Sequence, residues 1–165
     1  MDLKPEEANR ETTEQIRQMF ADSADVHMDE CALGSPDQRK IAYLIYAEGL
    51  TDIKPINEFV LPRLENFVGD AESGSNRHPF HLDWKTVDRI DEVPNLVYDG
   101  HLVIYLEQRG DIYAMNIANP PHRSPQDTNT EISIKGPRDG FVEEVTTNIA
   151  LIRKRLRTPS LCSEF

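Results

Sequence analysis

Apolar residues along this chain follow two patterns, and the first pattern predicts strands. Residues 41–47 form an unbroken apolar run, which is typical of an interior strand buried on both faces. Residues 26–31 alternate apolar and polar positions, as a half-covered strand does. Residues 102–106 and 112–117 are apolar runs on either side of a short Gly-containing turn, which predicts a hairpin. A fifth strand is predicted at 130–135.

The second pattern has helical spacing. A first helix is predicted from Thr13, its expected N-cap, with Ile16, Met19 and Phe20 facing inward. A second is predicted from Asp52 to Phe67, with a break or kink at Pro62. Its expected inward residues are Ile53, Ile56, Phe59, Val60, Leu64 and Phe67. A short helix is predicted over 91–98, stopped by Asp99-Gly100.

The last helix is predicted to begin at Pro137 and to end before Pro159. Acidic residues near its start and basic residues in its last turns complement the helix dipole. The expected inward stripe consists of Phe141, Val145, Ile149, Ile152 and Leu156. Asn148 lies at the edge of that stripe, where its amide needs hydrogen-bond partners. We expect a helix-to-strand hydrogen bond there, with a ligand contact as the alternative.

Strands interleaved with helices predict an α/β domain, with a mixed β-sheet of about four to five strands flanked by α-helices. Residues 1–10 are charged and poor in apolar side chains, so we expect a disordered N-terminal tail. Residues 11–159 are expected to form one α/β lobe. Residues 160–165 are expected to be a linker or the start of a further subdomain.

Composition narrows the function classes. The net charge of −11 argues against a general nucleic-acid binder. Cys31 and Cys162 lie far apart without metal-type spacing, which predicts free thiols. The N-terminus is polar rather than signal-like, and no apolar run approaches the roughly 20 residues of a membrane-spanning helix.

Candidate sites for chemistry are sparse. His78 and His81 could begin a metal site only with further ligands, for which Cys31, Asp83 and His101 are candidates. We favour ordinary loop histidines. Arg109-Gly110-Asp111 matches an adhesion tripeptide but is typical of a hairpin turn. Nucleophile elbows and phosphate-binding glycine loops are absent from the sequence. We therefore expect no enzyme activity, no metal and no cofactor.

Polar residues at the end of the chain have more than one interpretation. Glu131 and Arg138 could form an ion pair that locks the fold, which we favour, or contact a ligand. The basic stretch from Arg153 to Arg157 could complement the helix dipole, contact a second lobe or contact an acidic partner.

One long motif carries a family resemblance. Thr130-Glu131, Gly136-Pro137-Arg138-Asp139-Gly140-Phe141 and the run from Asn148 to Arg155 resemble the signature of the GerA family, the A subunits of bacterial spore germinant receptors. Residues 42–61 and 98–105 are similar to two further family segments, with Glu48 where aspartate is usual. The signature or interface candidates are Glu131, Gly136, Pro137, Arg138, Asp139, Gly140, Phe141, Asn148, Arg153 and Arg155.

The resemblance implies an N-terminal piece of a longer membrane protein in the spore inner membrane, with this segment on the cytosolic side. It implies one lobe of a two-lobed soluble region, and B and C subunits and other A-subunit copies as partners. Nutrient germinants trigger such receptors, and recognition is more readily assigned to the B subunit. We therefore expect a non-catalytic role in assembly and signal coupling. A free-standing soluble α/β small-molecule-binding module is the alternative.

Overall fold

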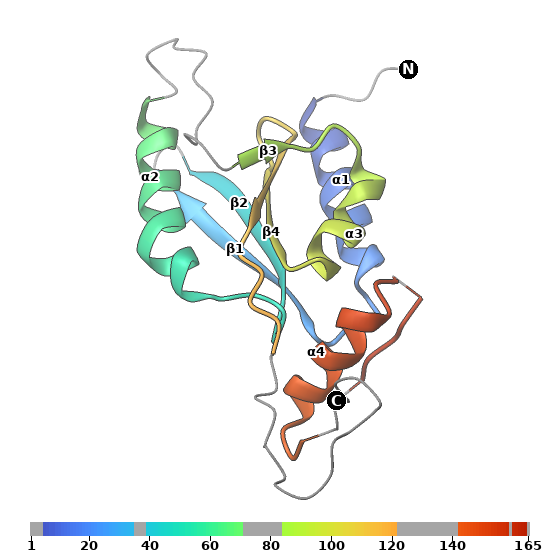
Figure 1. Cartoon of the computed structure of the whole chain (residues 1–165). Coiled ribbons are helices and arrows are strands. Elements are labelled where there is room, and N and C mark those ends of the chain that lie inside the picture. The colour runs from blue at the N-terminus through green and yellow to red at the C-terminus, as the bar shows by residue number, and fades with distance from the viewer. Residues whose placement is uncertain (1–4, 35–38, 71–83, 122–141, 159, 165) are drawn as a thin grey trace, which may run out of the picture.

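The computed structural model describes residues 5–34, 39–70, 84–121, 142–158 and 160–164. In this part of the chain, a five-stranded sheet lies between helices (Figure 1). The elements in chain order are α1 (Pro5–Met19), β1 (Val26–Leu33), β2 (Lys40–Ala47), η1 (Ile56–Val60), α2 (Leu61–Asp70), β3 (Trp84–Thr86), η3 (Ile90–Glu92), α3 (Val93–Tyr98), β4 (His101–Leu106), β5 (Asp111–Asn116) and α4 (Val145–Arg155).

The sheet has the strand order β1-β2-β4-β5-β3, and the described strands pair antiparallel throughout. The expected α/β class and the interior position of residues 41–47 are confirmed, and the five strands fall within the expected four to five. The fifth described strand is β3, which the sequence did not predict. The sheet is antiparallel rather than mixed. Short connections account for two of the pairings, β1 with β2 and β4 with β5. A short connection permits only antiparallel pairing, whereas parallel strands need a crossover of a dozen or more residues.

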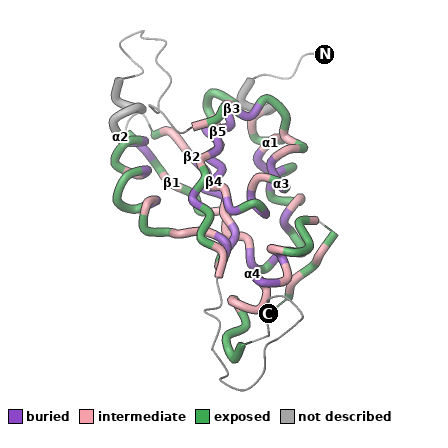
Figure 2. Tube along the Cα trace, viewed as in Figure 1, coloured by how far each residue is buried: buried purple, intermediate pink, exposed green. Residues whose placement is uncertain are grey.

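Each face of the sheet carries its own apolar core (Figures 1 and 2). On one face α1, α3 and α4 contribute buried residues such as Ile16, Val97 and Ala150. On the other face η1 and α2 contribute Ile56, Val60 and Leu64. Alternate residues of β2 and β4 enter the two cores, which explains why their apolar runs are unbroken.

The second predicted helix exists, but part of its predicted inward face is wrong. Ile56, Val60 and Leu64 are buried as expected, whereas Ile53 and Phe59 are 52% and 51% exposed. Residues 56–60 form a wider π-helical stretch directly ahead of Pro62, and the helix then continues as α2 instead of breaking. The wide turn shifts the helical phase, so Phe59 leaves the side that faces the sheet. The side chain of Phe67 lies outside the described residues.

The first helix begins earlier than expected. It starts at Pro5 rather than near Thr13, so residues 5–10, expected to belong to a disordered tail, are helical. Thr13 is therefore not an N-cap; it is buried, and its hydroxyl donates to the Asn9 carbonyl. Ile16 and Phe20 are buried as predicted.

The helix at 91–98 and the hairpin that follows it are confirmed. α3 ends at Tyr98, and Gly100 adopts a φ of 84°, a left-handed conformation that favours glycine. The hairpin pairs His101 with Asn116 through to Leu106 with Asp111. The strand expected at 130–135 and the loop containing His78 and His81 lie outside the described residues. Within the described part, no helix combines the length and apolarity needed to cross a bilayer.

Candidate functional site

The last helix differs from its prediction in both start and orientation. α4 begins at Val145, and residues 142–144 ahead of it are not helical; residues 137–141 lie outside the described residues. Val145 and Leu156, both expected inward, are 58% and 53% exposed. The helix instead buries Ala150, Leu151 and Arg153. The two ends of the predicted apolar stripe are therefore exposed, while Ile149 and Ile152 are partly buried and Phe141 lies outside the described residues.

Arg153 and Asp25 form a buried ion pair between α4 and the chain just before β1. The guanidinium Nε and Nη2 each donate to one carboxylate oxygen of Asp25 at 2.9 Å, which is a bidentate arrangement. The two side chains are 0% and 1% exposed. A buried charge of this kind is tolerated only when it is paired and hydrogen-bonded. Arg153 therefore belongs to the interior of the lobe.

Further groups complete the bonding of this pair. Arg153 Nη2 also donates to the Ser23 hydroxyl at 3.2 Å, and Nη1 donates to the Thr158 carbonyl at 3.2 Å. The guanidinium carbon lies 4.2 Å from the centre of the Tyr98 ring, a cation–π contact. The Tyr98 hydroxyl shares a 2.9 Å hydrogen bond with Ser23. The guanidinium thus joins the start of β1, the end of α3 and the segment after α4.

The Asp25 carboxylate also holds the last described residues of the chain. The Ser163 hydroxyl donates to Asp25 Oδ1. The backbone of Ser163 bonds on both sides of Ser23, with its N–H donating to the Asp22 carbonyl at 2.9 Å and its carbonyl accepting from Ala24 N–H at 3.0 Å. We call Asp25, Arg153, Ser23, Tyr98 and Ser163 the carboxylate junction.

The ionisation of Asp25 follows from this environment. Burial raises the pKa of Asp25, but the hydrogen bonds from Arg153 and Ser163, together with the Arg153 charge, lower it more. The net result is a pKa below the ordinary value of 3.8, so Asp25 is ionised at neutral pH. The junction therefore contains a buried, paired anion and cation.

α4 packs closely against the turn that follows β2. A Cβ at Gly49 would lie 3.0 Å from the Ala150 Cβ and 3.3 Å from Thr146. This close approach and the left-handed φ of 76° both favour glycine in the turn after β2. The helix-to-strand hydrogen bond expected of Asn148 stays a prediction, because the strand expected at 130–135 lies outside the described residues. Among the described residues, Asn148 bonds no strand. Its amide instead donates to the Val142 carbonyl at 2.6 Å and accepts from the Val142 N–H at 2.7 Å, which fixes the chain entering α4.

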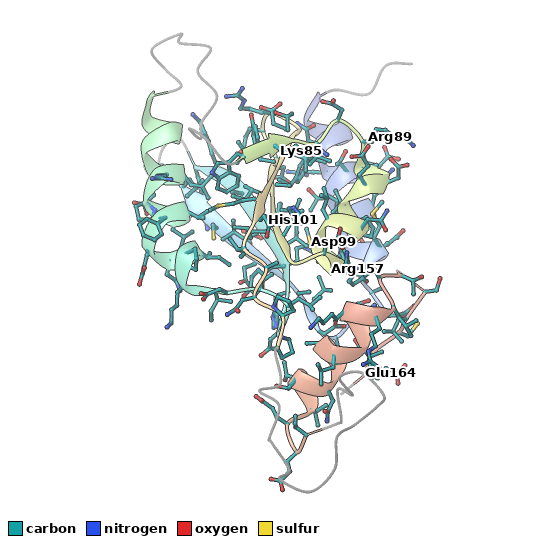
Figure 3. All side chains as sticks on the ribbon, in the orientation of Figure 1. Lys85, Arg89, Asp99, His101, Arg157 and Glu164 are labelled. Atoms are coloured by element: carbon teal, nitrogen blue, oxygen red, sulfur yellow. The ribbon has the colours of Figure 1, made fainter. Side chains whose placement is uncertain are left out.

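The remaining signature candidates divide into two groups. Arg155 is exposed on α4, while its neighbour Arg157 reaches back to Asp99 at 2.8 Å (Figure 3). Glu131, Gly136, Pro137, Arg138, Asp139, Gly140 and Phe141 lie outside the described residues, so the proposed Glu131–Arg138 pair stays a prediction.

The other candidates in the described part of the chain are the metal ligands, the cysteines and the hairpin turn. In the described ranges, no group of three or more His, Cys, Asp and Glu side chains is placed to hold a metal ion. Cys31 and Cys162 are free thiols, as predicted. Arg109 and Asp111 form a 2.7 Å ion pair across the turn at Gly110, whose φ is 69°, which fits the hairpin interpretation.

Sequence reasoning missed most of the carboxylate junction. Arg153 was a candidate through its motif, but Asp25, Ser23, Tyr98 and Ser163 were not. A weak signal existed in the helix itself. Projected at about 100° per residue, Ala150 lies well away from the apolar stripe, on a side that a small residue allows to pack closely, and Arg153 lies between Ala150 and the edge of the stripe.

Comparison with known proteins gives a consistent picture. A family described as Bacillus/Clostridium GerA spore germination protein matches residues 14–165. Spore germination protein XA of Bacillus anthracis is 34% identical over 72% of this chain and 25% of its own length. Spore germination protein KA of Bacillus subtilis is 29% identical over 86% of this chain and 27% of its own length. The chain thus spans about a quarter of these relatives.

A solved structure shares the fold. The N-terminal domain of the A subunit of the Bacillus megaterium spore germinant receptor GerK3 superposes with a TM-score of 0.60. The match covers 91% of this chain and 55% of that domain, at 16% sequence identity.

Proposed function

The chain belongs to the Bacillus/Clostridium GerA family of spore germination proteins, and we propose that it acts in spore germination as a non-catalytic N-terminal domain of a nutrient germinant receptor A subunit. Its task in this proposal is receptor assembly and signal coupling. The family match over residues 14–165 and the fold shared with the GerK3 domain support the assignment.

The carboxylate junction is the observation that carries the coupling role. A signal passing between the lobe and the chain that follows α4 needs a rigid connection. Arg153 on α4 and Ser163 beyond it bind the same carboxylate, Asp25, at the start of the sheet. A displacement of the segment 156–164 therefore acts directly on β1 and α3.

The same geometry supports a non-catalytic role for the junction. Asp25 and Arg153 are 1% and 0% exposed, so neither side chain can meet a substrate. Their hydrogen-bonding groups are used within the lobe. We further propose that the full-length protein resides in the spore inner membrane with this lobe on the cytosolic side, and that its partners are B and C subunits and other A-subunit copies.

The test uses the full-length protein in its own spore-forming host. Spores carrying Asp25→Asn are compared with spores carrying Leu64→Ala, a core truncation on the opposite face chosen to lower thermal stability by a similar amount. We expect Asp25→Asn to slow nutrient-triggered germination more strongly at equal receptor abundance. Germination triggered without nutrients should be unchanged in both. Equal germination defects in the two variants would contradict the coupling role and leave only a contribution to stability.

A further inference from the structure

Residues 160–164, which we call the strap, lie on the surface of the lobe after α4. Ser160, Cys162 and Glu164 are exposed, and Leu161 and Ser163 are only partly buried. Neither apolar core of the described chain includes a residue of the strap. Burial of apolar surface, which holds the helices and strands in place, therefore contributes little to the position of the strap.

Hydrogen bonds of Ser163 fasten the strap to the chain ahead of β1. Its N–H donates to the Asp22 carbonyl at 2.9 Å, its carbonyl accepts from the Ala24 N–H at 3.0 Å, and its hydroxyl donates to Asp25 Oδ1. The two backbone bonds form an isolated parallel bridge between Ser23 and Ser163. Since one residue of the strap makes all three bonds, they can form and break together.

The Asp25 carboxylate does not depend on the strap for its counter-charge. Arg153 Nε and Nη2 each donate to one of its oxygens at 2.9 Å, and both side chains are buried. Loss of the Ser163 hydroxyl leaves this bidentate pair intact, whereas loss of Arg153 would leave a buried charge unpaired. The backbone groups of Asp22 and Ala24 that Ser163 occupies can bond to water once it leaves. Detachment of the strap therefore costs less free energy than separation of α4 from the lobe.

We propose that the strap is a releasable latch, which detaches from Asp25 while Arg153 and α4 stay bound to the lobe. The Thr158 carbonyl accepts from Arg153 Nη1 at 3.2 Å, so Thr158 marks the end of the segment that stays bound. In the docked state, a displacement of the strap acts on the chain ahead of β1, and in the released state it does not. The latch thus regulates the proposed coupling, and it rests on the proposed function only for that biological meaning.

Native-state hydrogen exchange of the 165-residue chain tests the latch without reference to germination. The Ala24 and Ser163 amides report on docking of the strap, and the Glu48 amide, which donates to the Asp25 carbonyl at 2.8 Å, reports on the attachment of Asp25 to the end of β2. Each net hydrogen bond should slow exchange about fivefold, so the three bonds together should protect the Ala24 and Ser163 amides about 100-fold. Their exchange should depend little on urea, because release exposes little surface. The Glu48 amide should be protected at least about tenfold more and should follow global unfolding.

Ser163→Ala removes the hydroxyl bond to Asp25 and leaves the two backbone bonds. It should speed exchange of the Ala24 amide about tenfold, since the lost bond goes to a charged group, and leave the Glu48 amide unchanged. Ser160→Ala is the matched control, because it makes the same substitution at an exposed position of the strap. The control should leave both amides unchanged.

Equal protection of the Ala24 and Glu48 amides would overturn the proposal, because the strap would then open only with the whole lobe. Exchange of Ala24 at the rate of an unfolded chain would also overturn it, since the strap would not dock. A Ser163→Ala chain in which Ala24 exchanges no faster than in the native chain would do the same. The germination comparison of Asp25→Asn with Leu64→Ala spores is independent of these rates, so the latch can fail while the proposed function stands.

Discussion

Arg153 and Asp25 lie 128 positions apart in sequence and meet through two hydrogen bonds of 2.9 Å in the interior of the lobe. Each supplies the charge that makes burial of the other tolerable. Since Arg153 is on the last helix and Asp25 precedes the first strand, the pair closes the fold by joining its two ends.

Removal of one member of this pair should destabilise the lobe strongly. Asp25→Asn and Arg153→Met should each lower the free energy of unfolding by about 3–5 kcal/mol, since each leaves a buried group without its counter-charge. The double variant should be more stable than the sum of the two losses predicts, because neither charge remains. Urea denaturation of the four proteins measures this coupling, and strictly additive losses would contradict it.

Acidic pH should lower the stability of the lobe, because it protonates Asp25. The folded pKa of Asp25 lies below its unfolded value of 3.8, so the ionised form stabilises the fold above that value. This contribution is complete at neutral pH, begins to fade as the pH approaches 3.8, and is lost as the pH falls through the lower folded pKa. The free energy of unfolding of the native chain, measured from pH 7 to pH 3, should fall as the pH approaches and passes 3.8. Asp25→Asn should flatten the profile, and an unchanged profile would contradict the assignment.

Local sequence patterns were sufficient to predict much of the sheet. The apolar run at 41–47, the hairpin that ends at Asn116 and the stop at Asp99-Gly100 each depend on neighbouring residues, so the sequence predicted them correctly. The orientation of α4 could not be obtained this way. Periodicity reveals an apolar stripe but not which side of the helix finds a partner. The partner of Arg153 comes from the far end of the chain, so no local pattern indicates that the arginine is buried.

Asn148 should stabilise the start of α4 through the two backbone groups of Val142. Asn148→Asp tests this, because a carboxylate can still accept from the Val142 N–H but cannot donate to its carbonyl. We expect a loss of about 1 kcal/mol, with a similar loss for Asn148→Ala. Hydrogen exchange of the Val142 amide should rise in Asn148→Ala and much less in Asn148→Asp. Equal exchange rates in all three chains would show that the paired contact does not persist in solution.

The raised pKa of Tyr46 should be measurable in an alkaline titration. Burial and the 2.9 Å hydrogen bond to Asp29 raise the pKa of Tyr46 to about 12. The folded chain therefore holds the phenol proton above the ordinary value of 10, and stability falls as the pH rises from 10 toward 12. Burial also raises the pKa values of Tyr43, Tyr105 and Tyr113, so absorbance titration near 295 nm should show several late tyrosines, and Tyr46→Phe should remove one of them. The Asp29→Asn variant should titrate earlier, since it removes the negative charge beside the phenol.

Gly100 and Gly110 form a matched pair for testing backbone strain. Both have a left-handed φ, of 84° and 69°. A Cβ at Gly100 would lie 2.7 Å from the Ala118 Cβ and 3.0 Å from the Leu50 carbonyl oxygen, whereas one at Gly110 would meet only the Asn9 side chain, at 3.0 Å. Gly110→Ala should therefore cost about 1 kcal/mol from conformation alone, and Gly100→Ala about 3 kcal/mol or more because backbone must also move. Thermal unfolding of the two variants measures the difference. Equal losses of stability would contradict this, because they would mean that residues 50 and 118 move to make room for a Cβ at position 100 at little cost in free energy.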